Sequence, residues 1–342
     1  MKAARLHNYK SPLSLDEVPT PVPEPGQVVV KVAGAGFCHS DLHIIDGEID
    51  LPLPLPLTLG HENAGYVAAV GRGVTTVREG DAVIVYGGWG CGTCGPCVTG
   101  HEQLCDNPQW AGLSKWNGGY AESILVPQER YLVKLSKLDP RRAAPLADAA
   151  LTPYRAIKKA LPFFEPDYKV LVIGLGGLGE YGLKLLRLFC GCKIIAVDTS
   201  DEKLKLARRE GAAYALNGRD SKLAEKVLEL TGGKGVCASF DFVGTDQTLA
   251  TAISTTRAMG KVTQVGLAGG AANLKVLANS RFEVTFEATL WGTLKELREV
   301  VALAETGRLS LEETEFAPLD RINDVCARLK RGGVTGRLVM TP

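Results

Sequence analysis

The sequence predicts an α/β protein of two domains, one rich in short strands and one built on a doubly wound parallel sheet. Three observations support this class. Short β-like segments separated by Gly and Pro occupy roughly residues 1–130. From near residue 148, strands and helices alternate. A G-x-G-x-x-G motif lies where the first apolar strand of that second region meets its first helix.

The length and composition agree with this class. A chain of 342 residues is long enough for two domains, and 45% hydrophobic with 23% charged residues is typical of a globular protein. The net charge of +1 gives no support for binding to nucleic acid or membranes. The N-terminus lacks the apolar core of a secretory signal, and we find no stretch of about 18 apolar residues. We therefore expect a cytoplasmic protein.

The N-terminal region contains four segments that we interpret as strands, at 27–37, 64–71, 81–87 and 121–127. Two proline-rich segments, 18–26 and 51–57, should be extended or looped because each proline lacks an amide donor. The alternating Leu and Pro of 51–57 have two interpretations. They form either a surface connection packed by leucines or the rim of a substrate pocket.

The second region has the rhythm of βαβ units. Predicted strands lie at 168–173, 193–197, 235–242, 261–266 and 284–290, and predicted helices at 176–189 and 201–211. After Trp291 we expect another helix, a β-like stretch, a helix over 319–331 and a closing strand over 337–340.

Four cysteines lie within fifteen residues with the spacing C-x2-C-x2-C-x7-C: Cys91, Cys94, Cys97 and Cys105. Glycines and a proline in the short gaps let the backbone fold around one ion. Four thiolates leave no open coordination position, so the pattern favours a closed, structural zinc site. A disulfide pair is the alternative, but the odd count of 9 cysteines and the absence of a secretory signal argue against it.

The glycine motif predicts a dinucleotide site. Gly174 permits a tight turn, Gly176 lets the backbone approach a pyrophosphate at the helix N-terminus, and Gly179 allows close packing of helix and strand. Gly177 and Leu178 complete the loop. Asp198 ends the next strand and is placed to accept hydrogen bonds from a ribose 2′-hydroxyl. Its charge would repel a 2′-phosphate, so NAD is favoured over NADP.

Residues of types that bind metals also occur in two nearby segments, FCHSDLH (37–43) and GHENAG (60–65). A Cys and a His separated by 23 residues, Cys38 and His61, carry little information alone. However, residues 60–74 match the pattern G-H-E-x2-G-x5-G-x2-V of zinc alcohol dehydrogenases at every fixed position. The chain thus resembles the medium-chain, zinc-dependent alcohol dehydrogenases over essentially its whole length. It is most similar to bacterial NAD-dependent secondary-alcohol dehydrogenases and aryl ketone reductases, whose APL-x-DA-x-LTPY segment is present as APLADAALTPY (144–154).

The resemblance implies a GroES-like catalytic domain over 1–148 and 291–342, with the structural zinc lobe at about 88–108, and a Rossmann NAD-binding domain over 149–290. It also implies a catalytic zinc held by Cys38, His61 and Asp148. Asp148 stands where many relatives have cysteine, and its alternative role is an N-cap for the helix near Pro153. Glu62 is either an extra ligand or the partner in a salt bridge. Asp41 would orient His61.

The implied activity is NAD-dependent interconversion of alcohols, apolar secondary ones above all and primary ones as well, with ketones or aldehydes. Zinc would act as a Lewis acid on the substrate oxygen while hydride passes to or from the nicotinamide. The resemblance assigns a proton relay to Ser40 and His43. The alternative for His43 is a surface residue on a short helix.

Further cofactor contacts are implied for His39, Lys203, Val243, Val265, Leu290, Trp291 and Arg337. Arg337 suits a phosphate, with a solvated surface charge as its alternative. Trp291 is also expected to line the substrate pocket together with Trp89 and Trp116. The alternative for these tryptophans is packing in the core or in an interface. The four remaining cysteines are expected to pack in the interior rather than to take part in redox chemistry: Cys190, Cys192, Cys237 and Cys326.

The resemblance further implies a homo-oligomer, a tetramer or a dimer, that acts on small molecules. Two other functions stay open. One is a polyol or amino-alcohol dehydrogenase of the same superfamily, and the other is a non-catalytic dinucleotide-binding redox sensor. A zinc-ribbon module for nucleic acid is disfavoured by the net charge and by the single compact cysteine lobe.

Overall fold

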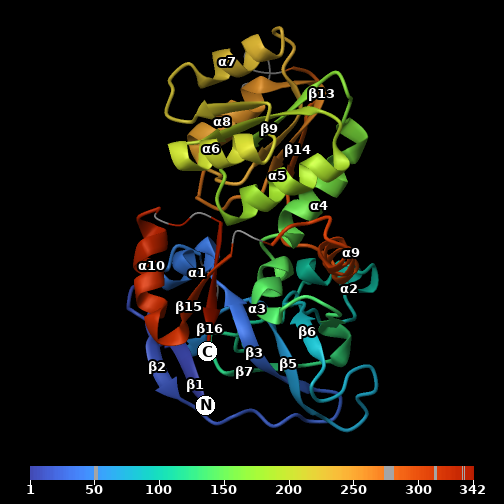
Figure 1. Ribbon diagram of the computed structural model, residues 1–342, viewed down its shortest axis with the longest axis vertical. Helices are drawn as coiled ribbons and strands as arrows, with labels where there is room; N and C mark the ends of the chain where they lie inside the picture. Colours follow the sequence, from blue (N-terminus) through green and yellow to red (C-terminus); the bar gives the residue numbers. More distant parts are fainter. Residues whose placement is uncertain (50–52, 273–280, 312–313, 333, 335) are drawn as a thin grey trace. The chain divides into compact units, whose positions relative to one another are not determined.

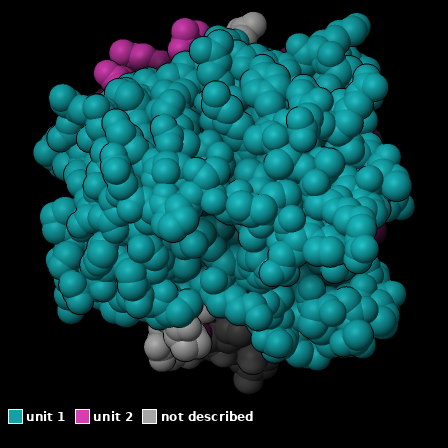
Figure 2. All heavy atoms as spheres, turned by 90° about the horizontal axis from the view of Figure 1, so that it is seen from below, with its two compact units in different colours: residues 1–151, 291–342 teal, residues 152–290 magenta. Residues whose placement is uncertain are grey.

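The computed structural model of the protein describes residues 1–49, 53–272, 281–311, 314–332, 334 and 336–342. The chain divides into two compact units, which Figure 2 shows in separate colours. Unit 1 consists of residues 1–151 and 291–342, and unit 2 of residues 152–290. In sequence, unit 2 is therefore an insertion into unit 1. The described residues include no helix long and apolar enough to cross a membrane.

Unit 1 is built on two β-sheets (Figure 1). The smaller has the strand order β2-β1-β4, and the larger has the order β15-β16-β3-β5-β6-β8 with β7 paired to β3. The strands are β1 (Lys2–Leu6), β2 (Ser14–Glu17), β3 (Val28–Gly36), β4 (Leu57–Thr58), β5 (Glu62–Val70), β6 (Ala82–Val85), β7 (Ser123–Val126), β8 (Leu132–Lys134), β15 (Thr314–Pro318) and β16 (Arg337–Thr341). Short helices connect them: α1 (His39–Ile45), α2 (Gly95–Val98), α3 (Pro140–Ala143), α9 (Leu294–Glu305) and α10 (Ile322–Lys330).

The pairing of β3 with β5 positions the chemistry of unit 1. Both strands are rich in valine and small residues, and most of their side chains are buried. They run antiparallel, with Gly36 opposite Glu62. The residues that leave β3 therefore lie beside those that enter β5. On the other edge of β3, strand β16 pairs with its last two residues, with Val339 opposite Gly36.

Unit 2 holds a parallel sheet with the strand order β11-β10-β9-β12-β13-β14. The strands are β9 (Lys169–Ile173), β10 (Lys193–Asp198), β11 (Tyr214–Asn217), β12 (Val236–Asp241), β13 (Thr256–Gln264) and β14 (Thr285–Ala288). The helices are α4 (Leu151–Ala160), α5 (Gly177–Phe189), α6 (Asp201–Arg209), α7 (Leu223–Leu230) and α8 (Asp246–Thr255). The strand order reverses between β9 and β12, and ligands bind at such reversals in open α/β sheets.

Alternate residues of the central strands form the core on one face of this sheet. Leu171 and Ile173 of β9 lie beside Ile195 and Val197 of β10, and α7 covers them with side chains such as Val227. The intervening residues of both strands are also buried. Burial on both faces is what a parallel sheet between helices requires, and it explains the continuous apolar runs in the sequence.

The predicted α/β class is confirmed, and strands and helices lie where the sequence predicts most of them. The structure adds β11, α7 and α8, which the sequence pattern did not reveal. The helix expected over 319–331 begins as a 3-10 turn, η5 (Leu319–Arg321), before α10. In the Leu–Pro segment, residues 51 and 52 lie outside the described part of the chain.

Candidate active site

Four side chains of zinc-ligand type meet in the interior of unit 1: Cys38, His61, Glu62 and Asp148. Cys38 is the N-cap of α1 and follows β3, while His61 directly precedes β5. The antiparallel register of the two strands brings these positions together. Asp148 follows a 3-10 helix, η3 (Ala144–Ala147), and does not cap α4, which begins three residues later at Leu151.

The distances within this group fit a tetrahedral zinc ion. The Cys38 sulfur lies 3.7 Å from Oδ2 of Asp148, and Nε2 of His61 lies 3.6 Å from the same oxygen. With zinc bonds of about 2.3 Å to sulfur and about 2.0 Å to nitrogen and oxygen, tetrahedral geometry gives separations of about 3.5 and about 3.3 Å. The observed distances are only slightly longer. One thiol, one imidazole and one carboxylate thus lie at distances that suit three ligands of one zinc ion.

Asp41 faces the other nitrogen of the His61 ring. Its Oδ1 lies 3.5 Å from Nδ1 of His61, while its Oδ2 accepts hydrogen bonds from the Cys38 amide at 3.1 Å and the Tyr120 hydroxyl at 2.7 Å. Burial alone would lower the pKa of His61, but Asp41 and Asp148 outweigh it and raise this pKa well above its ordinary value. Asp41 therefore occupies the position from which a carboxylate orients a metal-binding imidazole.

Glu62 forms a buried ion pair with Arg337 of β16. Nε of Arg337 donates to Oε2 at 3.0 Å, and Nη2 donates to Oε1. The salt bridge, one of the two roles considered for Glu62, is thus present, and Glu62 also lies within reach of the other ligand-type side chains. Arg337 is only 4% exposed, so it is not the solvated surface charge considered from the sequence. The pair also requires glycine at position 36, because a Cβ there would lie 1.9 Å from Oε2 of Glu62.

The residues assigned to proton transfer lie on α1. The Cys38 thiol donates to the Ser40 hydroxyl at 3.5 Å, so Ser40 borders the ligand group. His43 lies three positions further along the helix and is half-buried, with Nδ1 at 2.5 Å from Oε2 of Glu48. Residues three apart share one helix face. His39 begins the helix and is exposed.

Two tryptophans form an aromatic wall beside His61. Trp291 lies edge-on to the His61 ring, with centroids 5.6 Å apart, and Trp110 lies edge-on to Trp291 at 6.3 Å. Trp291 is held by a hydrogen bond of 2.7 Å from Nε1 to the carbonyl of Ala147, the residue before Asp148. Trp110 was missed by the sequence interpretation, because it lies in no motif. Among the described atoms, its buried Nε1 has no hydrogen-bond partner.

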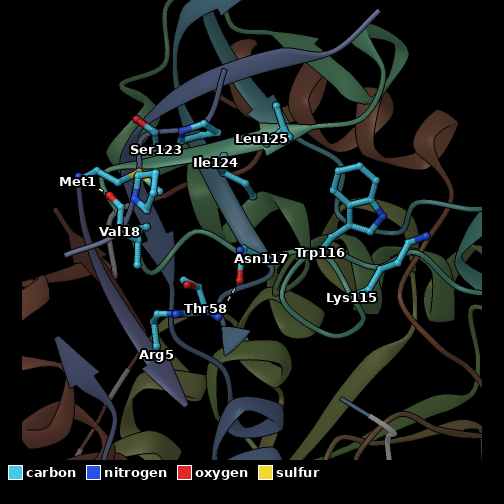
Figure 3. Close-up of a pocket in the computed structure, with 14 residues that line it drawn as sticks. Met1, Arg5, Val18, Thr58, Lys115, Trp116, Asn117, Ser123, Ile124 and Leu125 are labelled. Carbon is cyan, nitrogen blue, oxygen red and sulfur yellow. Dashed lines mark hydrogen bonds between the residues drawn. The ribbon is translucent and has the colours of Figure 1, made fainter. Parts of the chain in front are cut away.

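The other two tryptophans expected in the pocket, Trp89 and Trp116, contact each other in unit 1. Trp89 is fully buried, stacked on Tyr131 and edge-on to Trp116. Trp116 lines a cavity of about 340 Å³ with Arg5 and other residues from the start of the chain (Figure 3). Neither Cys38 nor His61 is among the residues that line this cavity. It is therefore separate from the ligand group.

The four-cysteine lobe also fits a zinc ion. The side chains of Cys91, Cys94, Cys97 and Cys105 are close enough to share one ion. The sulfurs of Cys94 and Cys105 lie 3.7 Å apart. Tetrahedral zinc–sulfur bonds of about 2.3 Å give a sulfur–sulfur separation of about 3.8 Å. All 9 cysteines of the chain are free in the structure, so the disulfide alternative finds no support. Helix α2 lies within this lobe.

In unit 2, the glycine loop follows β9 and opens α5. Gly174 has φ +86°, and Gly179 packs so closely that a Cβ would lie 1.8 Å from the carbonyl of Gly174. These contacts match the turn and packing roles predicted for the two glycines. Gly176 is the N-cap of α5, and a Cβ there would meet no protein atom within 4 Å. Gly177 and Leu178 form the first turn of the helix, whose amides favour an anion.

Asp198 holds the glycine loop as well as ending β10. Its Oδ2 accepts a hydrogen bond of 2.7 Å from the amide of Leu175, and its Oδ1 accepts one of 2.9 Å from the amide of Ser200. A crevice of about 250 Å³ opens beside it and is lined by Gly174, Asp198, Val243 and Thr248, among others. The lining contains no lysine or arginine. It therefore offers no cationic partner for a 2′-phosphate.

The other expected cofactor residues of unit 2 are placed as follows. Val243 lies against the turn at Gly174, where a glycine Cβ would come within 2.5 Å of it. Val265 is buried just after β13, and Leu290 is partly exposed after β14. The amide of Lys203 donates to the Ser200 hydroxyl at the start of α6. Thr245, Gln247 and Thr248 also border the crevice but follow β12 without a recognisable motif.

Comparisons with known proteins agree with both units. The alcohol dehydrogenase GroES-like domain matches residues 24–137, and the zinc-binding dehydrogenase domain matches residues 177–306. An NAD-dependent alcohol dehydrogenase of Sulfurisphaera tokodaii is 36% identical, and the alignment covers 100% of both chains. A D-arabinose 1-dehydrogenase (NADP(+)) of Saccharolobus solfataricus is also 36% identical, over 100% of this chain and 97% of the other.

Among solved structures, the alcohol dehydrogenase of the archaeon Aeropyrum pernix superimposes with a TM-score of 0.93. It is 39% identical, and the match covers 100% of both chains. Three findings agree on one family: the full-length identity, the two domain matches and the buried zinc-type ligand set. The chain belongs to the family of zinc-type, medium-chain alcohol dehydrogenases.

Proposed function

We propose that this enzyme is an NAD-dependent alcohol dehydrogenase that interconverts apolar alcohols, mainly secondary but also primary, with ketones or aldehydes by hydride transfer. The observation that carries the proposal is the buried set of Cys38, His61 and Asp148 at zinc-ligand distances beside an aromatic wall. A structural site does not need an open fourth position. A non-catalytic redox sensor has no use for one either.

In this proposal, Cys38, His61 and Asp148 hold zinc, and Asp41 fixes the imidazole through Nδ1. When bound, the ion supplies a Lewis acid for an alcohol or carbonyl oxygen. Ser40 borders the ligand group and accepts the hydroxyl proton, which His43, on the same face of α1, passes to solvent. The buried Glu62–Arg337 pair keeps both of these charges neutralised next to the ligands.

NAD is proposed as the cofactor, bound at the glycine loop of unit 2. Support comes from the acidic Asp198 and from the absence of a basic residue in the lining of the described crevice. His39, Lys203 and Arg337 are retained as proposed contacts. Arg337 has donors left for such a contact, because its two hydrogen bonds to Glu62 use only one hydrogen of Nε and one of Nη2.

The substrate class rests on the aromatic wall of Trp291 and Trp110, which favours an apolar group next to the reacting carbon. A polyol or sugar substrate is the second candidate, and the similarity to a D-arabinose 1-dehydrogenase favours it. A sugar needs several hydrogen-bond partners in the pocket. The unpaired Nε1 of Trp110 is one donor of that kind among the described residues.

Two zinc ions per chain are proposed, one at the three-ligand set and one in the four-cysteine lobe. The unbridged cysteines support a reducing compartment such as the cytoplasm. A homo-oligomer, tetramer or dimer, is also proposed. It is supported by the exposed Phe282 and Phe286, which lie beside or on β14 at the edge of the unit 2 sheet.

The first experiment measures NADH formation from NAD with primary, secondary and polyhydric alcohols, and with D-arabinose, in untreated and chelator-treated enzyme. Turnover supports the proposal if it is strongest on apolar secondary alcohols, is lost after chelation and is restored by added zinc. Stronger turnover on the sugar or polyols selects the second candidate. Bound NADH, measured by fluorescence, without turnover on any compound would contradict the dehydrogenase assignment.

A further inference from the structure

Three of the four cysteines outside the two zinc-type groups lie together in unit 2. Cys190 is the C-cap of α5, Cys192 directly precedes β10, and Cys237 lies in β12. The sulfurs of Cys192 and Cys237 are 4.0 Å apart, and the amide of Cys192 donates to the Cys190 sulfur at 3.2 Å. The sequence interpretation expected these cysteines to pack without redox chemistry. In the fold, Cys190, Cys192 and Cys237 follow one another as neighbouring thiols, which we call the thiol row.

The three thiols differ in exposure in a way that sets their order of reaction. Cys190 is half-buried and adjoins the exposed Gly191, Cys192 is 8% exposed, and Cys237 has no exposed surface. A reagent from solvent therefore meets Cys190 first. Cys192 is the next thiol inward, and its own hydrogen donates to the carbonyl of Glu165 at 3.1 Å.

We propose that Cys190 and Cys192 form a peroxide-oxidised site, in which Cys190 is the reacting thiol and Cys192 condenses with it to give a Cys-Gly-Cys disulfide. Hydrogen peroxide is the oxidant. This site serves no step of the alcohol dehydrogenase reaction and does not rest on the proposed function.

The reaction has two balanced steps. The Cys190 thiolate attacks one peroxide oxygen, the O–O bond breaks, and with one proton taken up the products are a sulfenic acid and water. The Cys192 thiol then attacks the Cys190 sulfur, the S–O bond breaks, and a second water leaves as the S–S bond forms. Two thiols lose two electrons in total, and one peroxide becomes two waters.

The local environment favours this division of roles. Hydrogen bonds from Cys192 lower the pKa of the Cys190 thiol, against the opposing effect of burial. The hydrogen bond to Cys190 raises the pKa of Cys192 to about 11, so Cys190 is the more acidic of the two. Since the thiolate is the nucleophile, Cys190 reacts first. Cys237 is fully buried, and its pKa is raised by its hydrogen bond to Cys192 and by burial.

The spacing of Cys190 and Cys192 along the chain permits the bridge, and we expect the bridge to be strained. Cα atoms two residues apart are separated by at most about 7 Å, which is close to the upper limit for a disulfide. Strained disulfides are reduced more readily, so this one should be reversed by dithiothreitol. The pair lies at the opposite end of α5 from the glycine loop, and 13 helical residues span about 20 Å. We therefore expect NADH binding to survive the oxidation.

The test treats the zinc-loaded enzyme with limited hydrogen peroxide, blocks remaining thiols with iodoacetamide and maps tryptic peptides. Trypsin cleaves after Arg187 and Lys193, so both cysteines lie in one peptide, 188–193, while Cys237 lies in peptide 235–257. The expected product is peptide 188–193 without alkylation and lighter by two hydrogen atoms, which dithiothreitol converts back. Cys326 is a matched internal control. It is a half-buried lone thiol whose pKa burial raises to about 12.

Two variants separate the steps. Cys190→Ser should leave Cys192 reduced, and Cys192→Ser should stop the reaction at a Cys190 sulfenic acid that dimedone traps. Oxidation of peptide 188–193 should be at least about tenfold faster than that of Cys326, because the thiolate fraction controls the rate. Equal rates at the two sites, oxidation of Cys192 in Cys190→Ser, or a cross-link between peptides 188–193 and 235–257 would each overturn the proposal.

Discussion

The buried pair of Glu62 and Arg337 should make Arg337→Met strongly destabilising. Both side chains are at most 4% exposed, and the substitution removes the cation while it keeps most of the apolar volume. Glu62 is then left as a carboxylate without its two donors inside unit 1. Breaking a buried ion pair from one side costs about 3–5 kcal/mol, because the remaining charge is uncompensated.

The size of the effect follows from the size of the unit. For a unit of about 200 residues, each kcal/mol shifts the Tm by about 2–4 °C, so we expect a fall of about 6–20 °C. Thermal unfolding of the zinc-loaded enzyme, followed by circular dichroism, measures it. Arg328→Met is the matched control, since Arg328 makes a comparable two-bonded pair with Glu315 on the surface. Its loss should change stability by no more than about 1 kcal/mol.

A second substitution tests the cause. Adding Glu62→Gln to Arg337→Met replaces the stranded charge with a neutral amide, so the double variant should recover at least about half of the lost stability. The reasoning fails if Arg337→Met melts within the range of the Arg328→Met control. It fails equally if the double variant is no more stable than Arg337→Met alone.

Three further predictions concern the metal sites and the cofactor. Cys38→Ser should abolish turnover while NADH binding, measured by fluorescence titration, stays largely intact; wild-type turnover in the variant contradicts the ligand assignment. Cys94→Ser should remove one zinc per chain and lower the Tm before it changes kcat, so an unchanged melting curve at the lower zinc content argues against a structural role. Asp198→Ala should narrow the ratio of kcat/KM for NAD over NADP. Asp198→Asn, which retains one acceptor oxygen, is the control. An unaltered ratio in Asp198→Ala would contradict the assignment of Asp198 to the ribose hydroxyl.

Features encoded within a short stretch of sequence were predictable. The cysteine lobe and the glycine loop each lie within one short segment, and their spacing alone restricts the geometry that the backbone can adopt. Asp198 could be placed because strand and helix lengths in βαβ units vary little. The parallel sheet could be predicted because strands and helices alternate after residue 148.

Features made by distant residues were not predictable from residue patterns. Cys38 and Asp148 are 110 positions apart, and only the resemblance to a known family connected them. The Glu62–Arg337 pair spans 275 positions, and a lone arginine in a β-like segment gives no sign of its partner. Trp110 belongs to no periodic pattern. The thiol row likewise depends on β10 and β12 lying on either side of β9, an order that the sequence does not state.

The late position of β16 in the chain has a consequence for synthesis on the ribosome. Strand β3 and Glu62 leave the ribosome early, but Arg337 and β16 follow only after all of unit 2 has been translated. During that interval the end of β3 at Ala35 and Gly36 lacks its partner strand on one edge, and the Glu62 carboxylate lacks its counter-charge. Unit 2 can complete its own sheet first, so nascent chains truncated before residue 337 should hold a folded unit 2 beside an unfinished, protease-sensitive unit 1.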